Sequence, residues 1–209
     1  HHIHETIDLD IPIILFDRIS SNVYCDKVII DDVEGAKKAT NHLIKNGRKS
    51  ILLITTEDYV SVGNLRTSGY IQALKENNIE LDTDLIIKVE DKKSTEEELH
   101  NIEERINEVL KLKSNIDGIF AVNEIYAASA LKVLKKNNIK IPEEVGVIGF
   151  TDGVISRFSD PSLTTVDQHG EKIGKQACKL LIERLNKTNN IPYQTKIIET
   201  SITSRQSSK

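Results

Sequence analysis

Short apolar runs and longer amphipathic stretches alternate along most of the chain. Runs rich in Ile and Val occur at residues 11–16, 50–55, 117–122 and 145–150. Continuous apolar runs of this length are typical of strands that are covered on both faces, as in a parallel sheet. Apolar residues at helical spacing occupy the segments between them, at 33–46, 64–77, 95–112 and 124–137. This order predicts an α/β fold with doubly wound parallel sheets.

The last quarter of the chain extends this pattern and then changes it. A short strand at 163–167 precedes a predicted helix over 170–186, and a polar turn at 187–192 follows. The segment TKIIETSIT at 195–203 alternates apolar and polar side chains, as an edge or half-exposed strand does. We therefore expect the chain to end in a sheet.

Several helix ends are marked by sequence. Ser94 and Glu97 have the spacing of a capping box at a helix start. Three helix stops resemble one another: IKNGRKSI at 44–51, LKENNIEL at 74–81 and LKKNNIKI at 134–141. Each predicts a last helical turn, then a Gly or Asn that tolerates the left-handed conformation, then an apolar residue that returns to the sheet.

Composition places the chain among ordinary globular proteins. Its 209 residues are 38% hydrophobic and 29% charged, which is enough to bury a core. The two cysteines, Cys25 and Cys178, are far apart and belong to no CxxC motif, which favours a reducing cytoplasm. No apolar run is long enough to span a membrane, and the first residues lack the apolar segment of a signal peptide. We predict a cytoplasmic protein without a membrane partner.

Charge and chain start bear on the partners. The formal net charge is −4 and the lysines are scattered among acids, so the chain has no basic stripe for a phosphate backbone. The chain alone should bind DNA poorly. It contains no Met and opens in what resembles the end of a helix, so we expect a fragment of a longer protein.

Polar and aromatic residues follow the predicted strands, at the edge where open parallel sheets bind ligands. They are Phe16, Asp17, Arg18, Tyr59, Asn64, Arg66, Asn123, Glu124, Thr151 and Asp152. An aromatic ring can stack on the apolar face of a sugar, while carboxylates, amides and an arginine make directed hydrogen bonds to its hydroxyls. The set predicts a site for a polyol.

Most of these residues also have a structural alternative. Asp17 and Arg18 can pair with each other, and Asn64 and Asn123 can each be a helix N-cap. Arg66 is the stronger candidate for a ligand contact, because the dipole opposes a cation in the first helical turn and requires a compensating partner.

Signatures of enzymes and metal sites are absent from the sequence. It has no GxSxG elbow, no phosphate-binding GxxxxGK[ST], no GxGxxG after a strand and no HExxH. We therefore predict no enzyme and no cofactor. His1, His2 and His4 can be read as metal ligands, but we interpret them as a tag remnant or a solvated helix end and predict no metal site.

Several segments together resemble one family. They are IPIILFDR (11–18), DVEGAKKATNHLIKNG (32–47), NLRTSGYIQAL (64–74), DGIFAVNEIYAASALKVL (117–134), IPEEVGVIGFTD (141–152) and PSLTTVDQ (161–168). In order and spacing the chain resembles the effector domain of the LacI/GalR family of bacterial transcription regulators, which has a periplasmic-binding-protein-like fold.

The resemblance implies roles for particular residues. Asp17 resembles the sugar-facing aspartate of the family, Arg66 its effector-binding arginine, Asn123 its hydroxyl-binding asparagine and Gln168 its crossover glutamine. Many members have an aspartate where this chain has Thr151, followed here by Asp152.

The resemblance also implies two lobes joined by three crossovers. Residues 48–165 and 192–209 would form the C-terminal lobe, and residues 1–47 and 166–191 an N-terminal lobe that lacks its opening βαβα units. The helix-turn-helix headpiece would lie upstream.

A homodimer is implied as well, because the predicted helix over 124–137 has more apolar residues than one packed face requires. The expected contacts are Ala127, Ala128, Leu131, Leu134, Ile155 and Phe158.

By this resemblance, a sugar or sugar phosphate binds between the lobes and modulates DNA binding by the full-length dimer. The alternative is a periplasmic sugar-binding protein of a transport or chemotaxis system. That protein would be monomeric and would begin with a signal peptide.

Overall fold

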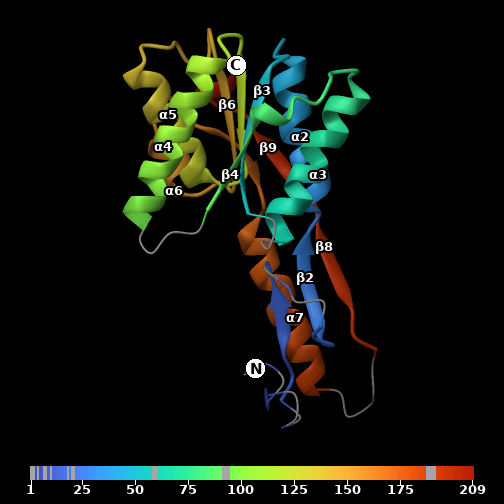
Figure 1. Cartoon of the computed structure of the whole chain (residues 1–209). Coiled ribbons are helices and arrows are strands. Elements are labelled where there is room, and N and C mark those ends of the chain that lie inside the picture. Colours follow the sequence, from blue (N-terminus) through green and yellow to red (C-terminus); the bar gives the residue numbers. More distant parts are fainter. Residues whose placement is uncertain are drawn as a thin grey trace. The chain divides into compact units, whose positions relative to one another are not determined.

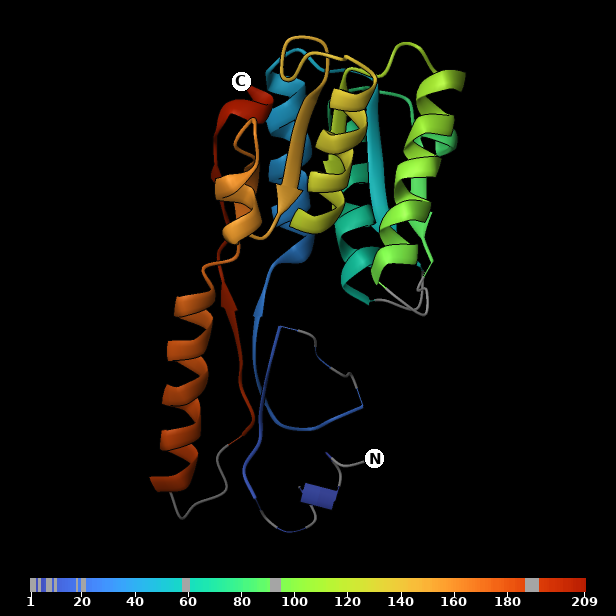
Figure 2. The same ribbon diagram turned by 90° about the vertical axis from the view of Figure 1, so that its left-hand side faces the viewer.

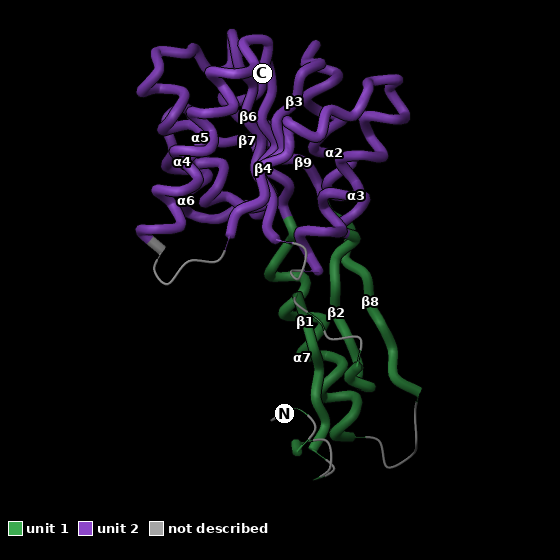
Figure 3. The backbone as a smooth tube through the Cα atoms, in the orientation of Figure 1, with its two compact units in different colours: residues 1–31, 168–200 green, residues 32–167, 201–209 purple. Residues whose placement is uncertain are grey.

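The computed structural model describes residues 3, 5–6, 9, 11–17, 19, 22–57, 61–90, 95–186 and 192–209. By its contacts the chain divides into two compact units, shown in different colours in Figure 3. Unit 1 comprises residues 1–31 and 168–200, and unit 2 comprises residues 32–167 and 201–209. The chain therefore passes from one unit to the other after residues 31, 167 and 200.

Unit 1 is a small parallel sheet with one long helix. Its described elements are β1 (Ile14–Phe16), β2 (Asp26–Ile30), α7 (Gly170–Asn186) and β8 (Thr195–Ile198). The strand order is β1-β2-β8, and both pairings are parallel. The buried side chains of α7 are Ile173, Ala177 and Leu180, which recur at helical spacing and pack toward the sheet.

Unit 2 is a larger, doubly wound layer structure. Its sheet contains β4 (Ile86–Val89), β3 (Ile51–Thr56), β5 (Gly118–Ala121), β6 (Gly146–Phe150), β7 (Thr164–Asp167) and β9 (Ser201–Thr203), in that spatial order. All neighbours are parallel except β7 and β9, which are antiparallel. The helices are α2 (Asp32–Lys45), α3 (Ser61–Glu76), α4 (Thr95–Leu112), α5 (Glu124–Lys136) and the short α6 (Val154–Phe158).

The helices of unit 2 cover both faces of its sheet, as Figures 1 and 2 show. α2 and α3 lie on one face, and α4 and α5 lie on the other. The central strands are therefore buried on both sides, and the side chains of Ile51–Ile54 are essentially inaccessible. This arrangement confirms the α/β fold with a doubly wound sheet that the continuous apolar runs predicted.

The three similar helix stops have the predicted geometry. Gly47, Asn78 and Asn138 all have positive φ angles, of 87°, 55° and 56°. After α3, the N–H of Ile79 donates to the Leu74 carbonyl at 2.9 Å, and after α5 the N–H of Ile139 donates to Leu134 at 3.0 Å. These bonds belong to Schellman motifs, in which a left-handed residue lets the chain turn back and satisfy the last carbonyls.

The C-terminal alternating segment does not form one strand. It divides into β8, which pairs with β2 of unit 1, and β9, which pairs with β7 of unit 2. The break falls where the chain passes between the units, and both pieces are edge strands, as the alternation predicted.

The boundaries of the units differ from those expected of the lobes. Residues 32–47 were expected with residues 1–31, but α2 packs along α3 and against β6 and β7, and so belongs to unit 2. Residues 192–200 were expected in the C-terminal lobe, but β8 completes the unit 1 sheet. In both cases backbone pairing and helix packing decide the assignment.

Candidate functional site

Arg66 occupies the centre of the carboxyl-end edge of the unit 2 sheet. Its Nε donates to Oδ1 of Asp32 at 2.8 Å, Nη2 lies 2.8 Å from the same oxygen, and Nη1 donates to the Val122 carbonyl at 2.6 Å. The guanidinium carbon lies 3.7 Å from the centre of the Phe150 ring. A buried arginine requires a compensating partner, and for Arg66 this partner is Asp32.

The sequence of α3 explains how Arg66 reaches this edge. The sequence predicted Arg66 in the first turn of this helix. The helix begins at Ser61, however, so Arg66 lies in the second turn. Gly69 permits close contact between α3 and α2, because a Cβ there would lie 2.2 Å from the Val33 carbonyl oxygen. Asp32 is the first residue of α2. The packing of the two helices thus brings the carboxylate to the guanidinium.

Thr151 follows β6 directly and has an unusual backbone. Its φ angle is 80°, a conformation that is strained for a β-branched residue. Its N–H donates to the Val166 carbonyl at 2.9 Å, which holds it in place. Asp17, directly after β1 in unit 1, also has a positive φ, of 63°. Such strain is concentrated at ligand-binding positions.

Asp152 has partners within the chain, and its predicted ligand contact stays a prediction. Its Oδ1 lies 2.6 Å from Nη1 of Arg205 and accepts a hydrogen bond from Thr165 at 2.9 Å. Oδ2 lies 3.4 Å from Arg157. Burial alone would raise the pKa of Asp152, but the hydrogen bonds from Arg205 and Thr165 and the two positive charges outweigh it and lower this pKa. The carboxylate anchors the C-terminal segment beside Thr151.

The asparagines and the neighbouring Glu124 have mixed roles. Asn123 is the N-cap of α5, where its Oδ1 accepts from the N–H of Tyr126 at 2.8 Å, so its structural alternative is realised. Asn64 is exposed near the start of α3. Glu124 accepts from the N–H and hydroxyl of Ser156 and so fixes the start of α6.

The remaining predicted contacts lie elsewhere. Phe16, Asp17 and Gln168 belong to unit 1, and their part in a ligand site stays a prediction. Phe16 is exposed at the end of β1, and Gln168 is half-buried before α7. Arg18, Tyr59 and Ser94 lie outside the described residues.

Three of the dimer contacts expected on α5 have little exposed surface, and the expected dimer stays a prediction. Ala127, Leu131 and Leu134 are buried within the chain itself, because α5 packs at once against the sheet, α4 and α6. Its surplus of apolar residues serves these several neighbours. Ile155 and Phe158 on α6 are exposed, Phe158 by 84%, so they are available to a partner.

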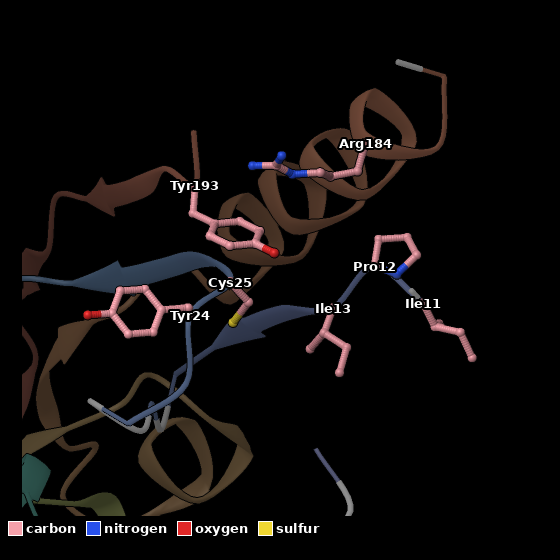
Figure 4. A pocket seen from close by; sticks show the side chains of 7 residues that line it. All are labelled: Ile11, Pro12, Ile13, Tyr24, Cys25, Arg184 and Tyr193. Atoms are coloured by element: carbon pink, nitrogen blue, oxygen red, sulfur yellow. The ribbon is translucent and has the colours of Figure 1, made fainter. Parts of the chain in front are cut away.

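A separate cavity of about 260 Å³ lies in unit 1 (Figure 4). Its lining residues are Ile11, Pro12, Ile13, Tyr24, Cys25, Arg184 and Tyr193. Residues 11–13 and 24–25 precede β1 and β2, so this cavity lies at the amino ends of these strands. Arg184 pairs with the buried Asp26 through both guanidinium Nε and Nη2, at 2.5 and 3.0 Å.

Within the described part of the chain, no group of three or more His, Cys, Asp or Glu side chains could hold a metal ion. None of the described helices combines the length and apolar character that a membrane span requires. His1, His2 and His4 lie outside the described residues.

Two residues of the Arg66 cluster were missed from sequence. Asp32 was not predicted because the strand before it, β2, was not recognised; the tandem acids after the apolar VII of residues 28–30 were the available signal. Phe150 was assigned only to the strand. Its position as the last residue of β6 places its ring under the guanidinium.

Comparison with known proteins places this geometry in a family. The periplasmic binding protein-like domain matches residues 40–208. The MalR transcriptional regulator of Clostridium butyricum is 30% identical over 204 residues, which are 96% of this chain and 58% of MalR. The chain spans about half the length of the curated relatives that it matches.

Solved structures agree with this match. A LacI-family regulator from Enterococcus faecium with bound ribose has a TM-score of 0.82 and 25% identity, over 98% of this chain and 73% of that one. A LacI-type protein from Alkaliphilus metalliredigens, in complex with D-xylulofuranose, has a TM-score of 0.82 and 29% identity, over 99% and 74%. This chain belongs to the periplasmic binding protein-like family, in the form that LacI-type transcription regulators contain, which confirms the resemblance seen in the sequence.

Proposed function

We propose that this chain is the effector-sensing part of a LacI-type transcription regulator, and that its effector is a sugar or sugar phosphate. The observation that carries the proposal is the buried Arg66 guanidinium, fixed by Asp32 and by the Val122 carbonyl at the ligand-binding edge of a parallel sheet. Sugars bound to the related Enterococcus faecium and Alkaliphilus metalliredigens proteins support the class of ligand.

Three groups form the proposed contact surface in unit 2. Arg66 offers guanidinium N–H groups held in a fixed plane, and Phe150 supports the rear of that plane. Asn123 contributes its amide nitrogen, since its oxygen is used as the helix cap. Thr151 contributes its hydroxyl from a strained backbone beside them. Asp152 and Arg205 hold Thr151 in position without contacting the ligand.

Unit 2 corresponds, in this proposal, to the C-terminal lobe of the family, and unit 1 to part of the N-terminal lobe. A ligand that prefers one of two states of the protein raises the population of that state. DNA binding would be carried by a helix-turn-helix segment of the complete regulator, consistent with the net charge of −4 on this chain. We place such a regulator in the cytoplasm.

A homodimer is part of the proposal. The exposed apolar side chains of α6, Val154, Ile155 and Phe158, form its contact surface, which replaces the one expected on α5. Apolar residues at this density on a five-residue helix are better suited to a protein partner than to water.

The test is a thermal-shift screen of the chain against sugars and phosphorylated sugars, since a ligand that prefers the native state raises the melting temperature. Arg66→Ala should abolish the shift given by the best ligand. The matched control is Arg48→Ala, because Arg48 also binds backbone carbonyls, at Pro142 and Glu144, but at the amino ends of β5 and β6. Both variants should melt earlier, and only Arg48→Ala should keep the ligand response. A normal response in Arg66→Ala refutes the site.

A further inference from the structure

The positive charge of Arg66 is already matched by a buried negative charge. Nε and Nη2 both lie 2.8 Å from Oδ1 of Asp32, and the two side chains are only 7% and 9% exposed. Nη1 is directed to the Val122 carbonyl. The guanidinium therefore meets a ligand with a buried carboxylate directly beside it, and that carboxylate offsets its positive charge.

This pairing affects charged and uncharged ligands differently. A phosphate group carries close to two negative charges, and proteins bind it with cations or backbone N–H groups that lack a nearby carboxylate. Beside Arg66, the attraction of the guanidinium for a phosphate is opposed by repulsion from Asp32. Both interactions act in a poorly solvated environment, where water screens charges weakly. A sugar hydroxyl meets no such opposition, because it can donate to a carboxylate and accept from a guanidinium.

The carboxylate that follows Thr151 is also paired with an arginine. Nη1 of Arg205 lies 2.6 Å from Oδ1 of Asp152, whose side chain is 8% exposed. Arg157 lies on the other oxygen of that carboxylate, at 3.4 Å, and is well exposed to solvent. Arg66 and Arg205 are therefore each paired with a carboxylate.

We propose that Asp32 is a specificity-determining residue that makes the unit 2 site select an uncharged polyol over its phosphorylated counterpart. The inference rests on the proposed function and narrows its ligand class. A purely structural role for Asp32, as the partner of a buried arginine, gives a different expectation. In that case, replacing Asp32 changes stability but leaves the ratio of the two affinities unchanged.

Asp32→Asn is the informative variant. The contacts from Nε and Nη2 of Arg66 both reach Oδ1 of Asp32, and an asparagine Oδ1 can accept these two bonds. The substitution thus removes the negative charge and keeps the geometry. Asp26→Asn is the matched control, because Asp26 is also buried and paired with an arginine, Arg184, but lies in unit 1 at the start of β2.

The experiment is calorimetric titration of the wild-type chain and both variants with ribose against ribose 5-phosphate, glucose against glucose 6-phosphate, and inorganic phosphate. We expect wild type to bind the neutral member of the pair it recognises at least tenfold more tightly. Asp32→Asn should reduce that ratio at least tenfold, about 1.4 kcal/mol, and should gain binding of inorganic phosphate. Asp26→Asn should keep the wild-type ratio.

Each other outcome is decisive. An unchanged ratio in Asp32→Asn, or a wild-type preference for the phosphorylated sugar, overturns the role of Asp32 and leaves the proposed function standing. Failure of every sugar and sugar phosphate to bind wild type overturns the proposed function and this inference with it. If Asp32→Asn does not fold, the wild-type chain still decides: displacement of a bound neutral sugar by inorganic phosphate at millimolar concentration contradicts the proposal.

Discussion

Arg205 supports the segment that follows β6 through its ion pair with Asp152. Its Nη1 lies 2.6 Å from Oδ1 of Asp152 and donates to the Leu163 carbonyl at 2.8 Å, with the two side chains 18% and 8% exposed. Opposite charges near 4 Å attract by about 4 kcal/mol at an effective dielectric constant of about 20. Desolvation of the arginine offsets part of this attraction.

We expect Arg205→Gln to lower the free energy of unfolding by about 2–3 kcal/mol. Loss of one partner from a buried ion pair typically costs about 3–5 kcal/mol. The loss here should be smaller, because Asp152 still accepts a hydrogen bond from Thr165 at 2.9 Å and still pairs with Arg157 at 3.4 Å. The assay is urea unfolding followed by far-UV circular dichroism, because the chain contains no Trp. Arg157→Gln is the matched control. Its side chain is 63% exposed on the same carboxylate, so its loss should cost only about 0.5 kcal/mol.

The pH dependence gives a second measure of the same interaction. The pKa of Asp152 is lowered in the folded state, so its stabilising contribution is present above the unfolded pKa of about 3.9 and is lost as pH falls through the folded value. The difference between wild type and Arg205→Gln should therefore shrink below about pH 4. Equal losses in Arg205→Gln and Arg157→Gln at neutral pH would refute the reasoning.

Three further predictions concern packing, titration and assembly. Gly69→Ala should lower the free energy of unfolding by about 2 kcal/mol or more, because the added Cβ meets the backbone of α2. Gly174→Ala in α7 should raise it by about 0.5–1 kcal/mol, because the added Cβ meets no other atom. Urea unfolding measures both changes. Burial and the charge of Lys45 lower the pKa of His42, so folding stability should fall as pH drops below about 6.5. His42→Gln should flatten this slope in melting curves between pH 7.5 and 5.5. Phe158→Asp should shift sedimentation of the chain toward monomer, and an unchanged mass distribution would exclude α6 as the contact surface.

Much of the fold could be predicted because the decisive signals are local. Continuous Ile- and Val-rich runs identified β3, β5 and β6, and the Asn and Gly stops at residues 47, 78 and 138 identified helix ends. β2 and β4 were missed because each is a short segment of mixed polarity, DKVII and IIKV. Period alone does not distinguish such segments from loops.

The unit boundaries and half of the site were harder for a different reason. Residues 195–203 alternate without interruption, and only pairing with β2 and then β7 divides them between two sheets. Asp152 has the sequence position of a ligand contact, yet Arg205, 53 residues away in sequence, takes its carboxylate. Asp32 and Arg66 likewise come together only through the packing of α2 on α3. Local sequence carries no record of these long-range pairings.

The central claim is that the carboxyl-end edge of unit 2, around Arg66, binds a sugar effector. It is tested most directly by nuclear magnetic resonance of the ¹⁵N-labelled chain, titrated with the neutral sugar that gives the largest thermal shift. The account predicts the largest changes at the Arg66 Nε–H signal and at the amides of Asn123 and Thr151. Changes confined to Tyr24, Cys25 and Tyr193, around the unit 1 cavity, would contradict it.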